Sequence, residues 1–211
     1  QVLSNTANFS SPPNTTISSA EVFRHLPRTI TELRLQRRHP TEPFVVQQDA
    51  ATWLPEKLKV LELSSLSFQP DMSWFSHMPQ QLRYVSLSFY NFDPQGMHQL
   101  SQRCPSLQEL RFQPLSDNAF IGCAASVPHL PYKLKSYIVV GKFQHELITI
   151  AEELFDDLPP GLRELRIPGK LRDGFGPLRD LPLKLRLLEV GLRKCHPDHG
   201  IADFGQPFTV Q

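Results

Sequence analysis

The 211-residue chain has few of the features that mark a secreted disulfide protein or a membrane protein. Its three cysteines, Cys104, Cys123 and Cys195, are too few and too scattered for a disulfide framework, which favours a reducing compartment. No apolar run is long enough to cross a membrane. The formal net charge of +1 lacks the basic excess that is typical of nucleic-acid and membrane-surface binding. We therefore expect neither of these partners.

Sequence motifs for catalysis and metal binding are missing too. There is no phosphate-binding loop, no HExxH, no GxSxG and no paired-cysteine motif. Cys195, His196 and His199 lie close together, but no second cluster completes a zinc site around them. The sequence thus predicts a protein that is not an enzyme and that holds no metal or cofactor.

A repeated sequence motif is present instead, and it contains seven of the 20 prolines. In each copy a proline precedes a short run that ends in apolar residues at Leu-x-x-Leu-x-Leu spacing. The copies are LPRTITELRL, LPEKLKVLEL, MPQQLRYVSL, CPSLQELRF, LPYKLKSYIV, LPPGLRELRI and LPLKLRLLEV. Their prolines are Pro27, Pro55, Pro79, Pro105, Pro131, Pro159 and Pro182, spaced 28, 24, 26, 26, 28 and 23 residues apart. This period is typical of a leucine-rich-repeat solenoid.

The apolar pair of each copy predicts a short strand with one buried face, because its members lie two residues apart. Strands of successive repeats are expected to pair in parallel, with the proline in the turn before each strand. The predicted fold is α/β, a curved leucine-rich-repeat horseshoe with a concave parallel sheet and with helices and loops on its convex side. We expect helices over Ser19–His25, Asp93–Leu100 and His145–Asp157, and turns or a single turn of helix over Gly169–Gly176.

The repeat divides the chain into three parts. Residues 1–22 are expected to hold a partial N-terminal repeat, marked by Leu3 and Phe9, and a polar loop. Residues 23–193 form the array of about seven repeats, and residues 194–211 form a C-terminal cap or tail, because repeat arrays need polar ends.

The chain resembles the leucine-rich-repeat superfamily over residues 23–193. The unit from Asp93 to Leu110, DPQGMHQLSQRCPSLQEL, is similar to the cysteine-containing repeats of F-box proteins, and the other units resemble the degenerate repeats of F-box and related proteins. The resemblance implies that Cys104 is buried, whereas Cys123 could be buried or exposed. It also implies substrate recognition for ubiquitin ligation, with the ligase-docking part outside this chain.

Strand residues that alternate with the buried pair are expected on the concave face, in three rows. The first row is Glu32, Val60, Tyr84, Glu109, Ser136, Glu164 and Leu187. The second row is Arg34, Glu62, Ser86, Arg111, Ile138, Arg166 and Glu189. The third row is Gln36, Ser64, Ser88, Gln113, Val140, Pro168 and Gly191. Three Glu/Arg pairs are expected to form within or across the rows: Glu32 with Arg34, Glu109 with Arg111, and Glu164 with Arg166.

Aromatic and apolar residues interrupt these polar rows, as is typical of the centre of a protein interface. They are Tyr84, Phe89, Tyr90, Ile138 and Val140. Two alternatives remain open at this stage. Phe89 and Tyr90 either lie on the face or turn inward, and an irregular strand could place Ile138 and Val140 inside.

A further row follows the first leucine of each repeat, and we name it the basic row. Its members are Thr31, Lys59, Arg83, Gln108, Lys135, Arg163 and Arg186, of which five are basic. One interpretation is a positive stripe for an acidic or phosphorylated peptide. The other is that long side chains cover apolar surface while their charges stay in water.

The sequence predicts a non-enzymatic scaffold that binds a protein partner on its concave face. The expected partner-binding residues are Tyr84, Arg111, Ile138, Arg166, Glu62 and Arg34, supported by Arg83, Lys135 and Arg163. A cytoplasmic or nuclear location is favoured. The alternatives are an extracellular recognition module, which the sequons at Asn8 and Asn14 would suit, and a structural segment of a larger assembly. The partner and the oligomeric state are not predicted.

Overall fold

The structure is a computed structural model of the 211 residues. It describes residues 23–36, 45–46, 48–64, 67–68, 72–141, 149–150, 156–167, 170–171, 181–190 and 208–209.

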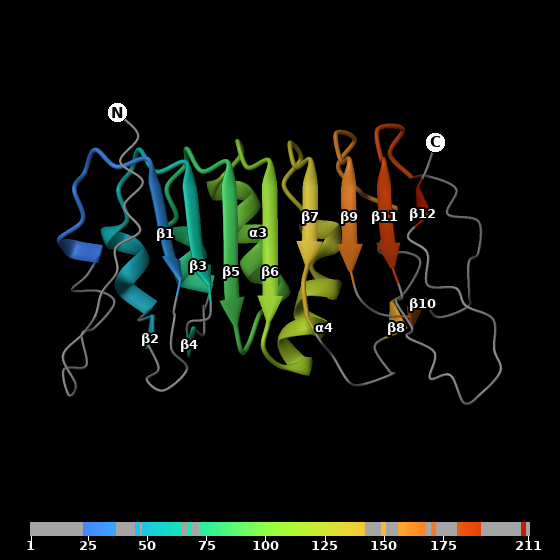
Figure 1. Ribbon diagram of the computed structural model, residues 1–211, viewed down its shortest axis with the longest axis horizontal. Coiled ribbons are helices and arrows are strands. Elements are labelled where there is room, and N and C mark those ends of the chain that lie inside the picture. Colours follow the sequence, from blue (N-terminus) through green and yellow to red (C-terminus); the bar gives the residue numbers. More distant parts are fainter. Residues whose placement is uncertain are drawn as a thin grey trace.

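The main sheet is built from the predicted strands in the order of the chain (Figure 1). Seven strands pair in parallel, and they are β1 (Glu32–Gln36), β3 (Val60–Ser64), β5 (Tyr84–Phe89), β6 (Glu109–Pro114), β7 (Ser136–Val139), β9 (Glu164–Ile167) and β11 (Leu187–Val190). The short strand β12 (Phe208–Thr209) adds to β11 in the antiparallel sense. The predicted α/β class and the parallel sheet are confirmed.

One turn recurs before each strand of the parallel sheet. The carbonyl of the repeat proline accepts a hydrogen bond from the amide three residues later, as between Pro55 and Leu58 at 3.0 Å and between Pro131 and Leu134 at 2.9 Å. Proline suits this place because the turn uses its carbonyl and requires no donor from it. In the fourth repeat the accepting carbonyl belongs to Cys104, to which Leu107 donates at 3.0 Å. Cys104, rather than Pro105, is therefore equivalent to the other six prolines.

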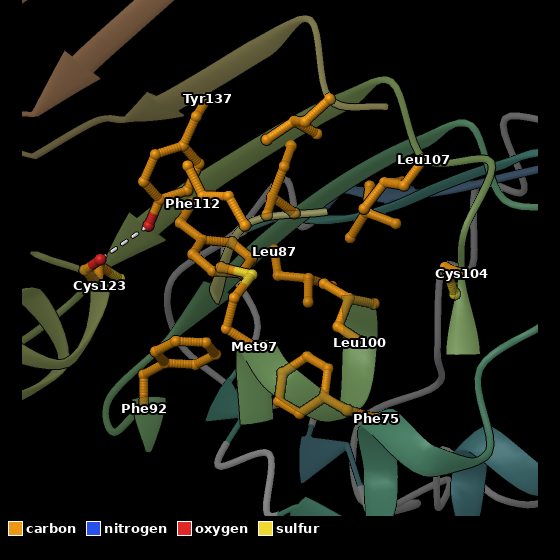
Figure 2. Packing of buried hydrophobic residues seen from close by; sticks show 14 of the residues in the cluster. Phe75, Leu87, Phe92, Met97, Leu100, Cys104, Leu107, Phe112, Cys123 and Tyr137 are labelled. Carbon is orange, nitrogen blue, oxygen red and sulfur yellow. Dashed lines mark hydrogen bonds between the residues drawn. The ribbon is translucent and has the colours of Figure 1, made fainter. Parts of the chain in front are cut away.

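The core follows from the alternation along the strands. In β3 the exposure alternates residue by residue, and Leu61 and Leu63 are fully buried. The register pairs Leu61 with Val85 on β5 and Val85 with Leu110 on β6, so that the buried residues form continuous columns. Figure 2 shows this layer, in which Phe112 and Tyr137 from the sheet and residues from the helices share one cluster.

Helical segments pack against the buried face of the sheet (Figure 1). They are the 3-10 helices η1 (Gln48–Trp53) and η2 (Val127–His129) and the α-helices α2 (Met72–Ser76), α3 (Pro94–Arg103) and α4 (Asp117–Ala125). Helix α3 confirms the prediction for Asp93–Leu100. The Asp93 carboxylate accepts a hydrogen bond from the Gln95 amide at 2.9 Å, and Pro94 occupies the first turn. Helix α4 was not predicted, because its apolar residues do not keep to one face: Ile121 is exposed, and the buried side includes Gly122, which is a poor helix former.

We call the segments that connect one strand of the main sheet to the next the return segments. Two predictions for them are wrong where the structure describes them. Thr149 and Ile150, inside the expected helix over 145–157, form strand β8 (Thr149–Ile150), which pairs in parallel with β10 (Lys170–Leu171). β-Branched residues favour this conformation, and pairing between repeats outweighs the local helical spacing. The expected turn over 169–176 likewise contains β10. A similar small pair joins β2 (Val45–Val46) to β4 (Ser67–Phe68).

Several predictions lie outside the described residues. They concern the partial repeat with Leu3 and Phe9, the sequons at Asn8 and Asn14, residues 19–22 of the first expected helix, Pro168 and Gly191 of the third row, and Cys195, His196 and His199. Within the described part, Phe23 and Arg24 are helical, in agreement with the prediction. No helix among the described residues has the length and apolar character needed to span a membrane.

Gly122 provides a test of how closely helix α4 packs on the preceding repeat. A Cβ atom on Gly122 would overlap the backbone carbonyl oxygen of Phe92, which cannot move without shifting the chain. We expect Gly122→Ala to lower the free energy of unfolding by roughly 2 kcal/mol or more, measured by urea denaturation. Gly161→Ala is the matched control, because its nearest heavy atom, the Leu134 carbonyl oxygen, lies 3.9 Å from the added carbon. Equal stability of the two variants would contradict this packing.

Candidate functional site

The face of the sheet opposite the core carries the first two predicted rows, and we call it the open face. In the third row Ser88 is buried, with 1% of its surface exposed. In the register, Tyr84 lies opposite Glu109 in the first row, and Arg111 lies opposite Ser86 and Ile138 in the second. The alignment of these two rows is confirmed from β1 to β11. No described helix covers this face, which is presented to the viewer in Figure 1.

The aromatic and apolar residues divide between the two faces as strand alternation requires. Phe89 is fully buried and packs against Phe92 and Phe112, with ring centroids 5.1 and 4.9 Å away, so of its two alternatives the inward one is correct. Tyr90, the next residue, is exposed. Ile138 lies on the open face, half-buried between the buried Tyr137 and Val139. Val140 is half-buried just after the strand.

At the N-terminal side of the open face, charges neutralise one another. The Arg34 guanidinium lies 3.1 Å from a carboxylate oxygen of Glu62 and 3.8 Å from one of Glu32. Its Cζ atom also lies 5.9 Å from the centre of the Tyr84 ring, which is within cation–π range. These groups are partly exposed, so each ion pair contributes only about 0–1 kcal/mol to stability.

The C-terminal side repeats this arrangement around Arg166. Its Nε atom lies 2.7 Å from a carboxylate oxygen of Glu164, and its Nη1 atom lies 3.3 Å from one of Glu189. Ser136 donates a further hydrogen bond of 2.9 Å to Glu164. Two of the three expected Glu/Arg pairs are thereby confirmed.

The centre of the open face differs from both sides. Among the described residues, neither Glu109 nor Arg111 forms an ion pair, so the third expected pair is not formed. Arg111 is exposed, and it lies between Ser86, which is only 8% exposed, and the apolar Ile138. Tyr84, Arg111 and Ile138 lie on the adjacent strands β5, β6 and β7, with Arg111 directly opposite Ile138 and with Tyr84 two residues before the strand position opposite Arg111.

The basic row lies at the starts of the strands and not on the open face itself. Each member donates its amide to the carbonyl of the member before it, as from Arg83 to Lys59 at 2.8 Å and from Arg163 to Lys135 at 2.7 Å. All five basic members are exposed. The structure thus separates Arg83, Lys135 and Arg163 from the six residues expected on the open face.

Further residues beside the basic row were not predicted. Lys57, Lys133 and Lys184 lie two residues before a basic member, in the recurring turn, and all three are exposed. Tyr132 and Leu183 occupy the residue directly after the turn proline and are also exposed. The signal that would have revealed them is position within the turn, because the two central residues of a tight turn point to solvent.

The two described cysteines belong to the core. Cys104 is fully buried, as expected, and its thiol donates to the Pro79 carbonyl at 3.4 Å. Cys123 is also buried, and its carbonyl oxygen accepts a 3.0 Å hydrogen bond from the Tyr137 hydroxyl (Figure 2). Within the described ranges, no group of three or more His, Cys, Asp or Glu side chains is arranged to hold a metal.

Comparison with known sequences adds no family assignment. No protein-family model matches the chain, and no curated protein matches it significantly.

Burial of the Cys104 thiol predicts a loss of stability in alkaline solution. Burial raises its pKa from the ordinary 9.0 to about 12, and the nearby Arg103 opposes the shift. The unfolded chain therefore ionises this thiol first, so its contribution is complete below pH 9 and is lost as the pH rises towards 12. We expect the free energy of unfolding to fall by up to about 1.4 kcal/mol per pH unit for this group.

The measurement is urea denaturation at several pH values above 8 for the wild type and for Cys104→Ala. The variant loses this group's share of the slope, whereas Cys123 and Tyr137, whose pKa values burial also raises, keep theirs. A slope identical in both proteins would show that the thiol titrates normally in the folded state.

Proposed function

We propose that the chain is a leucine-rich-repeat solenoid, curved like a horseshoe, whose open face is concave and binds another protein without catalysis. Three observations support the repeat architecture: the same turn before each strand, parallel strands in chain order, and buried columns shared by successive repeats. Such an array buries its core between neighbours and leaves one sheet face available.

The observation that carries the binding proposal is the uncompensated arginine at the centre of the open face. Arg34 and Arg166 each have two carboxylates within 4 Å, whereas Arg111 has none among the described residues. Arg111 also lies on β6, the fourth of the seven parallel strands. Aromatic residues and arginine are enriched at the energetic centres of interfaces. A partner carboxylate that reached Arg111 would complete a pair that the fold leaves open.

The partner that suits this centre presents an acidic side chain beside an apolar one. The carboxylate would face Arg111 on β6, and apolar groups on either side of it would contact Tyr84 on β5 and Ile138 on β7. Because the Cys104 repeat resembles those of F-box proteins, substrates of ubiquitin ligation are the first partner class that we propose. Glu62, Arg34 and Arg166 would form a polar rim in which the charges are already paired.

Replacement of Tyr84 and Arg111 by alanine is the direct test. The partner is first captured with the wild-type protein and identified, and its dissociation constant is then measured with purified components. We expect Tyr84→Ala/Arg111→Ala to weaken binding at least tenfold, which corresponds to about 1.4 kcal/mol. Both side chains project from the open face, so the thermal midpoint should stay close to that of the wild type.

The control is Asn118→Ala/Ile121→Ala, which truncates one polar and one apolar side chain, both exposed, on helix α4. It should bind the partner as the wild type does. An unchanged dissociation constant for the open-face variant, or equal losses for both variants, would remove the open face as the binding site.

A further inference from the structure

We propose that the basic row is a second binding surface, which takes an acidic peptide laid along the turns, perpendicular to the strands. This surface is separate from the open face and does not depend on the function proposed for it. Its core is Lys59, Arg83, Lys135, Arg163 and Arg186.

The backbone holds the basic row in a fixed line. Each member's carbonyl accepts two amides of the next repeat, as Lys59 accepts from Arg83 at 2.8 Å and from Tyr84 at 3.1 Å. The same pair of hydrogen bonds recurs at every step along the row, from Thr31 to Leu187. Neighbouring strands lie about 4.8 Å apart, so the seven positions span about 29 Å. The cations are therefore attached to a regular and continuous support.

Charge is strongly concentrated in the turns that carry this row. The seven turn segments, 27–31, 55–59, 79–83, 104–108, 131–135, 159–163 and 182–186, hold nine of the 22 Lys and Arg residues but only one of the 21 Asp and Glu residues. No ion pair involves a basic-row side chain in the part of the chain that the structure describes. The side-chain hydrogen bond from Lys135 goes to the neutral Gln108 amide, at 2.8 Å. Four of the open-face carboxylates are already engaged by Arg34 and Arg166.

The charge of the remaining chain favours a narrow ligand. Outside the seven turns the protein has 13 Lys and Arg residues against 20 Asp and Glu residues. A membrane surface or a nucleic-acid duplex that extended from the row onto the open face would meet the carboxylates there, which belong to Glu32, Glu62, Glu109, Glu164 and Glu189. A single peptide chain would contact the turns alone. The exposed Tyr132 and Leu183 in the same turns would offer it apolar contacts.

The spacing of the row specifies the peptide further. A polyproline II helix has three residues per turn and rises about 3.1 Å per residue, so every third side chain lies on one side, about 9.3 Å apart. Two steps of the sheet span about 9.6 Å. Arg83, Lys135 and Arg186 are separated by two such steps and are all basic. A peptide with acidic residues at i, i+3 and i+6 matches them.

The test uses fluorescence anisotropy with two labelled proline-rich peptides of identical composition. One carries glutamate at i, i+3 and i+6, and the other carries three adjacent glutamates. We expect the spaced peptide to bind several-fold more tightly, and its affinity to fall with added salt because the contacts are exposed ion pairs. Equal or tighter binding of the adjacent peptide would overturn the alignment along the row.

Two charge-matched variants locate the site. Arg83→Gln/Lys135→Gln/Arg186→Gln removes three row cations and should weaken binding of the spaced peptide at least about tenfold, since each exposed pair contributes modestly. Lys57→Gln/Lys133→Gln/Lys184→Gln removes three cations from the same turns and should cost less than about threefold. Equal losses would mean that a diffuse positive potential, and not the row, attracts the peptide. Thermal midpoints verify that both variants fold.

Further experiments test other anionic ligands, and test whether the peptide binds the open face instead. Phosphatidylserine vesicles or a dT oligonucleotide, bound more tightly than the spaced peptide and lost in the row variant, would overturn the proposal in favour of lipid or nucleic acid. Tyr84→Ala/Arg111→Ala retains all nine turn cations, so the basic row is intact in this variant. If the variant no longer binds the spaced peptide, the peptide binds the open face and its assignment to the basic row is wrong.

Discussion

The structure depends on one repeated constraint, the turn that closes before each strand. There the carbonyl of the proline, or that of Cys104, accepts a hydrogen bond from the amide three residues later, which belongs to a leucine or, in the first repeat, to Ile30. From the second repeat on, the next residue donates to the preceding repeat. Together these bonds fix where each strand begins relative to its neighbour. A shift of one residue would move every buried leucine to the opposite face. The hydrophobic columns and the turn bonds therefore enforce the same register.

That register also determines the electrostatics of the open face. Because row positions lie directly opposite each other, a glutamate on one strand and an arginine on the next meet without any adjustment of the backbone, as Arg34 and Glu62 do. At the centre the opposite partner of Arg111 is Ser86 on one side and Ile138 on the other. Its isolation is thus a direct result of which residues occupy neighbouring repeats. Local flexibility is not needed to explain it.

The parts of the fold that follow from a strict repeat could be predicted from the sequence, and the parts that vary between repeats could not. The two aligned rows and the buried leucines follow from a period of two within a period near 26 residues. Phe89 points inward because it follows Leu87 at the same two-residue spacing by which Leu87 follows the buried Val85. The return segments have no fixed spacing of apolar residues that recurs from repeat to repeat. Thr149 and Ile150 form a strand because a partner strand at Lys170–Leu171 is present, which no local pattern reveals.

The basic row differs from the columns because folding does not require its side chains to be basic. Position in the row is maintained by backbone amides and carbonyls, which Thr31 and Gln108 supply as well as Lys59 does. Exposed cations repel one another when they lie on adjacent strands, so five cations in seven positions bring a small cost to stability, and no ion pair among the described residues compensates it. The remainder of the chain carries the acidic excess. This separation of charge would orient an anionic ligand towards the turns before contact is made, and the proposed binding role of the basic row accounts for it, whereas the fold alone does not.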